Sequence, residues 1–151
     1  MSEGEGLSVL VVEDEAILAL EIEFVLRELG HTVAGVAMDS ARAQAVVESR
    51  RVDLALVDIN LRDGATGPEL CRRLVADHGT AVIFLTANPE QIPDGFAGAL
   101  GAMPKPFDDR AIRDLVVFAS SVIRDRRVPP APRRFRMAPW LLTPPNEIKP
   151  H

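Results

Sequence analysis

Short runs of aliphatic residues recur along this chain, and segments with helical spacing separate them. The runs are rich in Val, Leu and Ile, which is typical of strands that are buried on both faces. They fall at residues 7–12, 31–37, 52–59, 81–86 and about 99–103. Because strand, helix and strand in succession form a right-handed crossover, this alternation predicts a parallel sheet with helices on both sides.

Five helices are expected between and after these strands. They cover residues 16–29, residues 41–49, a segment with Pro68 near its start, a segment that opens at Asn88, and residues 107–126. Asp39 offers an N-cap to the second helix, and Gly30 is a plausible stop for the first. The fourth helix is expected to be weak, because prolines and glycines disfavour helix and Pro93 and Gly95 both lie in it.

Composition and charge narrow the class of protein. Apolar residues make up 47% of the chain, which is enough for a core, but no uncharged stretch approaches the roughly 20 residues that span a bilayer. The N-terminus has no signal-peptide pattern, so we expect a cytoplasmic protein without a membrane partner. Residues 1–125 carry 11 basic and 21 acidic side chains, whereas 126–151 carry six basic and one acidic. An acidic body does not suit direct binding of nucleic acid.

Polar side chains stand at the carboxyl ends of the expected strands, where sites lie in folds of this class. Glu13 and Asp14 follow the first strand, Asp58 the third, Thr86 the fourth, and Lys105 the fifth. Three carboxylates at one sheet edge repel each other, and Mg²⁺ with its preference for oxygen ligands relieves that repulsion. Together with an ammonium and a hydroxyl group, this set suits the transfer of a phosphoryl group onto a carboxylate.

The motifs VVEDE, LVDIN, FLTAN and MPKPF occur in that order within about residues 7–125. As an ordered set they resemble the receiver domain of bacterial two-component response regulators. The resemblance implies a flavodoxin-like (βα)5 fold, a doubly wound parallel sheet with strand order 2-1-3-4-5. The sequence FLTANPEQI is similar to receivers of the alphaproteobacterial general stress response.

The same resemblance implies roles for individual residues. Asp58 is then the phosphoacceptor, Thr86 the switch hydroxyl, and Lys105 the lysine that contacts the phosphoryl group. Lys105–Pro106 is expected to be a cis peptide. The Mg²⁺ ligands implied are Glu13, Asp14, Asp58 and the main-chain carbonyl of Asn60.

The implied function is that of a single-domain response regulator rather than an enzyme. Residues 1–126 form the receiver in this interpretation, and 127–151 are a Pro-rich extension with basic and apolar residues. The partners implied are a histidine kinase or phosphotransfer protein, a downstream protein, and a second copy in a homodimer. We further hypothesise that residues 88–100 reorder on phosphorylation, because a segment with low helix propensity has low local stability.

Three alternatives stay open beside this interpretation. Ala102 stands where many receivers have an aromatic residue, which leaves room for an interaction module that is not phosphorylated. A phosphatase with an aspartate nucleophile would want a second acid two residues after Asp58, where this chain has Asn60. A flavin-binding module would want a phosphate-friendly loop after the first strand, and the acids of that loop argue against it.

The extension and a few isolated residues complete the expectations. Seven of the 12 prolines lie in residues 128–151, so the extension is expected to be disordered or polyproline-like unless MAPWLL docks on a partner or another copy. Cys71 lies in the middle of an expected helix, and its side chain is expected to be packed or half-exposed rather than a redox sensor. His31 and His78 flank turns and are expected in solvated loops.

Overall fold

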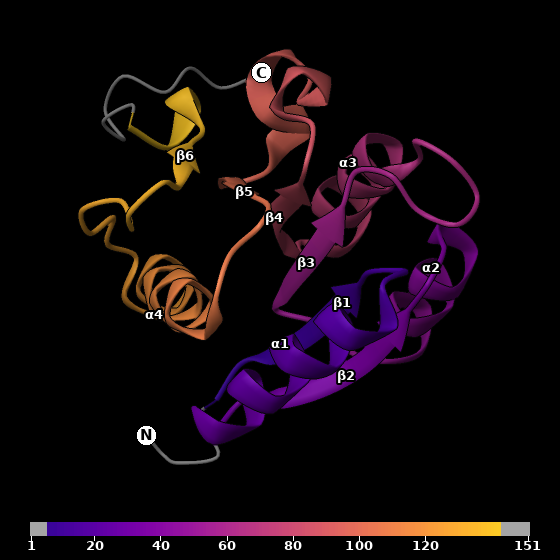
Figure 1. Cartoon of the computed structure of the whole chain (residues 1–151), viewed down its shortest axis with the longest axis horizontal. Helices are drawn as coiled ribbons and strands as arrows, with labels where there is room; N and C mark the ends of the chain where they lie inside the picture. Colours follow the sequence, from indigo (N-terminus) through magenta and orange to yellow (C-terminus); the bar gives the residue numbers. More distant parts are fainter. Residues whose placement is uncertain (1–5, 143–151) are drawn as a thin grey trace.

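Residues 6–142 are described by the computed structural model of this protein, and their strands form one sheet (Figure 1). The strand order is β2-β1-β3-β4-β5-β6, and neighbours among the first five pair in parallel. The expected order 2-1-3-4-5 is therefore confirmed. The five parallel strands are β1 (Ser8–Val12), β2 (Thr32–Ala37), β3 (Leu54–Asp58), β4 (Ala81–Thr86) and β5 (Gly101–Pro104).

Four α-helices cover the two faces of this sheet. They are α1 (Ala16–Glu28), α2 (Ser40–Ser49), α3 (Gly67–His78) and α4 (Asp109–Asp125). Helices α1 and α4 pack on one face, and α2 and α3 on the other, so each face has its own apolar core. Asp39 and Asp108 cap α2 and α4, because their side chains accept hydrogen bonds from the backbone N–H groups of Arg42 and Ala111.

The expected fourth helix is not an α-helix. Two short 3₁₀ segments, η1 (Pro89–Gln91) and η2 (Asp94–Gly98), occupy its place. Inside η2, Gly95, Phe96 and Ala97 have φ values of 73°, 57° and 52°, which lie in the left-handed region. The prediction of a weak fourth helix was therefore wrong. Prolines and glycines at this spacing prevent the continuous hydrogen bonds of an α-helix.

The C-terminal extension contributes the sixth strand. Strand β6 (Arg136–Met137) pairs antiparallel with β5, and a 3₁₀ turn, η3 (Pro139–Leu142), follows it. Within MAPWLL, Ala138 is buried and Met137 and Leu141 pack against the chain's own core, whereas Trp140 and Leu142 stay largely exposed. The sequence suggested disorder or docking on another molecule. Residues 143–151, which also belong to the predicted extension, lie outside the described residues.

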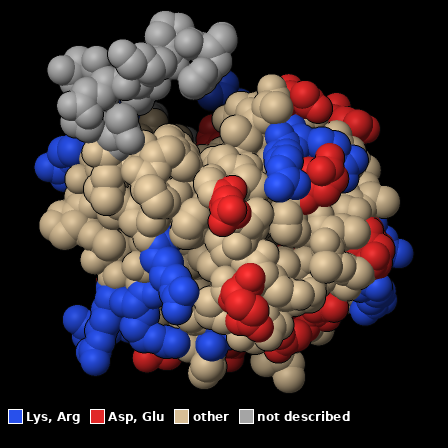
Figure 2. All heavy atoms as spheres, turned by 90° about the horizontal axis from the view of Figure 1, so that it is seen from above, with Lys and Arg blue, Asp and Glu red and all other residues tan. Residues whose placement is uncertain are grey.

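The surface reflects the uneven charge of the sequence. Figure 2 shows one group of basic side chains at the lower left of this face, and further basic side chains mixed with acidic ones on its opposite side. Arg110 of α4 and Arg133 and Arg134 of the extension line one groove together with Asp108 and Asp114. Among residues 6–142, none of the helices is long and apolar enough to cross a membrane.

Candidate functional site

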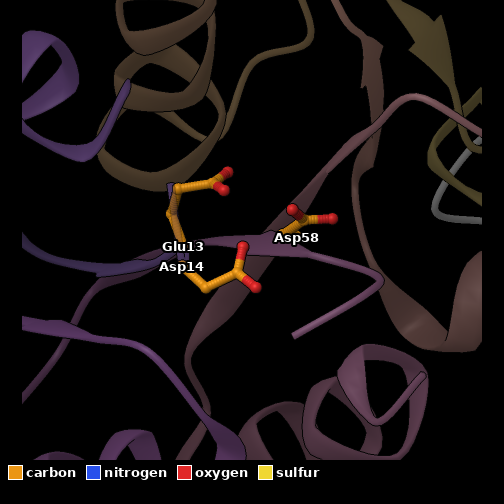
Figure 3. A group of neighbouring side chains, drawn as sticks. All are labelled: Glu13, Asp14 and Asp58. Atoms are coloured by element: carbon orange, nitrogen blue, oxygen red, sulfur yellow. The ribbon is translucent and has the colours of Figure 1, made fainter. Parts of the chain in front are cut away.

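Three carboxylates meet at the carboxyl ends of β1 and β3. These strands are neighbours in the sheet, so Glu13 and Asp14, directly after β1, come next to Asp58, the last residue of β3. One oxygen from each of the three lies within 4.8 Å of the others. Figure 3 shows the three side chains gathered at this strand edge. Glu13 is fully buried and Asp58 is 6% exposed, so water offers these charges little screening.

Lys105, in the loop after β5, provides the positive charge of the site. Its Nζ lies 2.9 Å from Asp58 Oδ2, 3.1 Å from Glu13 Oε1 and 2.8 Å from Glu15 Oε2. The lysine therefore bridges acids from two strand ends that are 45 residues apart in sequence, and only the fold brings them together. Glu15, the last residue of the VVEDE motif, was not predicted to belong to the site.

The ionisation of these groups follows from burial and from their neighbours. Burial, and then the negative charge of Asp58, raises the pKa of Glu13 to about 7. Burial alone would lower the pKa of Lys105, but hydrogen bonds to Glu15 and Asp58 and the charges of Glu13 and Asp58 raise it above its usual value. Lys105 is thus held as the ammonium ion, while an excess of negative charge stays around it.

The donor set fits a hard divalent cation. Glu13 Oε1 is buried and, although Lys105 Nζ is close, it makes no hydrogen bond of acceptable geometry. A buried carboxylate oxygen without a donor is costly, and a cation beside it would satisfy it. Glu13, Asp14 and Asp58 offer the oxygen ligands that Mg²⁺ prefers, and water molecules can complete its coordination.

The loops beside the carboxylates hold the other predicted residues. The backbone N–H of Asn60 donates to Asp58 Oδ1 at 3.0 Å, which fixes the orientation of that carboxylate. Thr86, the last residue of β4, is buried, and its hydroxyl oxygen accepts a hydrogen bond from the backbone N–H of Asn88 at 2.9 Å. The N–H of Lys105 in turn donates to the carbonyl oxygen of Thr86 at 2.8 Å.

The structure also bears on two further expectations for β5 and its loop. The Lys105–Pro106 peptide bond is cis, as predicted. Ala102 is fully buried and pairs with Phe84 of β4 in the sheet register. Strand β5 itself, with the sequence GAMP, therefore offers no aromatic side chain beside Thr86.

Comparison with known families agrees with this geometry. Residues 9–117 match the family described as the response regulator receiver domain. The phyllosphere-induced regulator PhyR of Methylorubrum extorquens is 39% identical over 88 residues, which are 58% of this chain and 33% of that protein. The sensory transduction protein RegX3 of Mycolicibacterium smegmatis is 35% identical over 122 residues, which are 78% of this chain and 50% of that protein. The chain thus spans half or less of the length of these relatives.

Solved structures give the same result for the fold. The receiver domain of PhyR from Erythrobacter litoralis superposes with a TM-score of 0.70 at 30% identity, covering 83% of this chain and 96% of that one. PhyR from Brucella abortus gives a TM-score of 0.67 at 27% identity, covering 80% of this chain and 49% of that one. The likeness to PhyR agrees with the predicted similarity to general stress receivers. From the sheet order, the acidic edge and the matched residues, we conclude that this chain belongs to the response regulator receiver domain family.

Proposed function

We propose that Asp58 accepts a phosphoryl group from a histidine kinase or phosphotransfer protein in a Mg²⁺-dependent reaction, and that the chain then signals through protein contacts. The observation that carries this proposal is the position of Lys105, whose Nζ lies 2.9 Å from the Asp58 carboxylate and within reach of Glu13. An aspartate that lacked the lysine and the neighbouring acids would not be proposed as an acceptor of a phosphoryl group.

In the proposed reaction, an oxygen of Asp58 attacks the phosphorus of a phosphohistidine. The P–O bond forms as the P–N bond breaks, and the imidazole leaves with the electron pair of that bond. Lys105 balances the negative charge that develops on the phosphoryl oxygens, and the Asn60 N–H holds the acceptor carboxylate in place. Glu13, Asp14 and Asp58 would hold Mg²⁺, which neutralises phosphoryl oxygens and offsets the repulsion between the carboxylates.

Helix α1 offers a surface on which the phosphodonor protein can dock. Ile17, Leu20 and Phe24 follow a helical spacing and are 76%, 64% and 58% exposed. This apolar row begins close to Glu13 and Asp14, so a protein that covers it would lie beside Asp58. Exposed aliphatic and aromatic side chains in one row are characteristic of an interaction site.

The downstream target is proposed to be a protein. The acidic body does not favour nucleic-acid phosphates, and PhyR of Bartonella quintana, a structural relative at 26% identity, is named an anti-anti-sigma factor. Regulation by protein contact in a stress pathway is therefore the downstream role that the likeness supports best for this chain.

A direct experiment tests the proposed acceptor. Wild type and Asp58→Ala are incubated with Mg²⁺ and a small-molecule acyl phosphate, and intact masses are measured. Wild type is expected to gain one phosphoryl group and Asp58→Ala none, while Asp77→Ala, which removes an exposed carboxylate on α3, is expected to react like wild type. Equal labelling of wild type and Asp58→Ala would contradict the proposal, and no labelling of either would favour an unphosphorylated interaction module.

The docking surface is tested separately from the chemistry. Phe24→Asp is expected to slow transfer from a phosphorylated histidine phosphotransfer protein at least about tenfold, since a buried interface aromatic is worth at least about 1.4 kcal/mol. Its reaction with the small acyl phosphate is expected to be unchanged. Equal slowing with both donors would mean that Phe24 acts through the site rather than through docking.

A further inference from the structure

The outer edge of β5 is covered by the chain's own extension. Gly101 pairs with Met137 and Ala102 with Arg136, in antiparallel register. The backbone N–H of Ala138 adds a hydrogen bond of 2.8 Å to the carbonyl oxygen of Leu100. Residues 134–142, which we call the edge cap, therefore satisfy backbone groups that an uncovered edge strand would present to other molecules.

Side chains of the edge cap also contact the receiver and hold the cap beside β5. The ring of Phe135 is 7% exposed and lies 5.0 Å from the ring of Phe118 on α4, centre to centre. Ala138 is fully buried, and Trp140 Nε1 donates to the carbonyl oxygen of Ala99 at 2.8 Å. A Cβ atom on Gly101 would collide with the Phe135 ring and the Arg136 carbonyl, so β5 has the residue that this close approach requires.

The backbone contact between the edge cap and β5 is nevertheless short. The ladder between β5 and β6 is two residues long, and Trp140 and Leu142 stay 43% and 64% exposed. Residues 129–132, which lead into the cap, include three prolines that hold no regular structure. A two-residue edge ladder opens at a lower free-energy cost than the longer ladders inside the sheet, and β5 is also held by its parallel pairing to β4.

We propose that the edge cap is a releasable cover, and that β5, once uncovered, pairs with β5 of a second copy of this chain. The edge accepts an antiparallel strand, as its pairing with β6 shows. Two copies related by a twofold axis present their β5 edges to each other in antiparallel sense. Release also uncovers apolar surface at Phe118, which a second copy would bury again. This inference goes beyond the proposed function and does not depend on phosphorylation.

The proposal is tested by introducing a charged side chain into the buried part of the edge cap. Ala138→Asp places a carboxylate where the side chain is fully buried, so it is expected to release the cap without altering β5. Trp140 is the only tryptophan of the chain, and its emission is expected to shift to longer wavelength on release. Sedimentation equilibrium on the full-length variant is expected to show an average mass that rises with concentration from one chain towards two, while wild type stays monomeric.

Two further variants keep the result decisive. Phe135→Ser is expected to act like Ala138→Asp and serves if that variant does not fold, and Leu142→Asp, at an exposed position of the cap, is expected to behave like wild type. Adding Gly101→Lys to a released variant is expected to restore the monomer, because a side chain at this position would enter the space that the strand paired with β5 needs. A released variant that stays monomeric, a dimer that survives Gly101→Lys, or a wild-type dimer with unshifted Trp140 emission would each overturn the proposal.

Discussion

Around Lys105, single side chains set the chemistry of the site through their charges. Glu13, Glu15 and Asp58 contact its ammonium group, and Asp14 lies next to them, so negative charge exceeds positive charge within this cluster. Because Glu13 and Asp58 are almost fully buried, this imbalance is only weakly screened by water. A cation bound at this cluster is therefore expected to raise the stability of the folded chain.

Magnesium is expected to stabilise the protein against unfolding. A ligand that binds only the folded state contributes about 2.7 kcal/mol when its free concentration is about 100 times its dissociation constant. Wild type is thus expected to unfold at a higher temperature with Mg²⁺ than with a chelator, as measured by circular dichroism. Asp14→Asn is expected to abolish most of this difference, whereas Glu21→Gln, on the exposed face of α1, keeps it. An equal Mg²⁺ effect in both variants would place the cation elsewhere.

A second residue-scale prediction concerns His31, which was expected in a solvated loop. The structure instead half-buries it, and its Nδ1 accepts a hydrogen bond from the backbone N–H of Leu7 at 2.9 Å. Burial, and then the nearby charge of Arg124, lowers the pKa of His31 below its usual value. The unfolded chain therefore binds this proton first, so the stabilising contribution is full above the ordinary histidine pKa and is lost as the pH falls through it towards the folded-state value.

Urea unfolding at a series of pH values measures this contribution. Between about pH 7.5 and about pH 5.5, the free energy of unfolding is expected to fall less in His31→Asn than in wild type, since about pH 6.5 is the ordinary value for histidine. His78→Asn, which removes an exposed imidazole, serves as the matched control and is expected to follow wild type. Parallel curves for wild type and His31→Asn would contradict the assignment.

The helices and strands show where sequence reasoning succeeds and where it fails. Composition predicts the Val- and Leu-rich strands that are buried on both faces, and helical periodicity predicts the amphipathic last helix. Consequently β1, β3, β4 and α4 were predicted within a few residues. The acidic edge was predictable because parallel strands end at one edge of a sheet. Strand β6 was not, because a two-residue strand in a Pro-rich segment depends on the shape of β5 and carries no periodic signal of its own.

Segment η1–η2 is the element from which we expect a change on phosphorylation. Phe96 and Ala97 are held in left-handed conformations that cost roughly 1–2 kcal/mol each for residues with a side chain. Asn60, two residues after Asp58, hydrogen-bonds through its side chain to Gln91 in this segment. A change at Asp58 can therefore reach a strained element of the chain.

Hydrogen exchange combined with thiol labelling tests this expectation. Phosphorylated wild type is expected to exchange amides of residues 88–100 at a different rate from the unmodified protein, while β4 stays protected. Cys71 reports on the same region, because its thiol is fully buried and bonded to the carbonyl oxygen of Ala97, and burial raises its pKa to about 12. It is expected to resist alkylation in the unmodified protein and to react faster if η2 moves away. Unchanged exchange in protein shown by mass to be phosphorylated would reject the hypothesis.

At the scale of the whole molecule, the edge cap and the acidic site share β5 and the loops on either side of it. Trp140 bonds to the carbonyl oxygen of Ala99, just after η2, and Arg134 Nη1 donates to the carbonyl oxygen of Pro106 at 2.8 Å, just after Lys105. One end of the cap therefore contacts the loop after Lys105, at the acidic edge of the sheet, and the other contacts the segment between η2 and β5, at the opposite end of that strand. If Lys105 moves towards a phosphoryl group on Asp58 in the proposed reaction, that movement is expected to act on the contact between Arg134 and Pro106.

Such shared contacts predict a reciprocal coupling between the two places. If phosphorylation or Mg²⁺ binding at the acidic site weakens the cap, release of the cap must favour that same state by the same factor, because linked equilibria are symmetric. Trp140 emission is thus expected to shift when wild type, but not Asp58→Ala, is treated with Mg²⁺ and an acyl phosphate. In the reverse direction, Ala138→Asp is expected to change the Mg²⁺ affinity in the same sense, whereas Leu142→Asp leaves it as in wild type. Trp140 emission that does not change in protein with a confirmed phosphoryl group, together with an unchanged Mg²⁺ affinity in Ala138→Asp, would mean that the cap and the site are independent. If the two were thermodynamically coupled, a change of state in one would have to alter the equilibrium of the other.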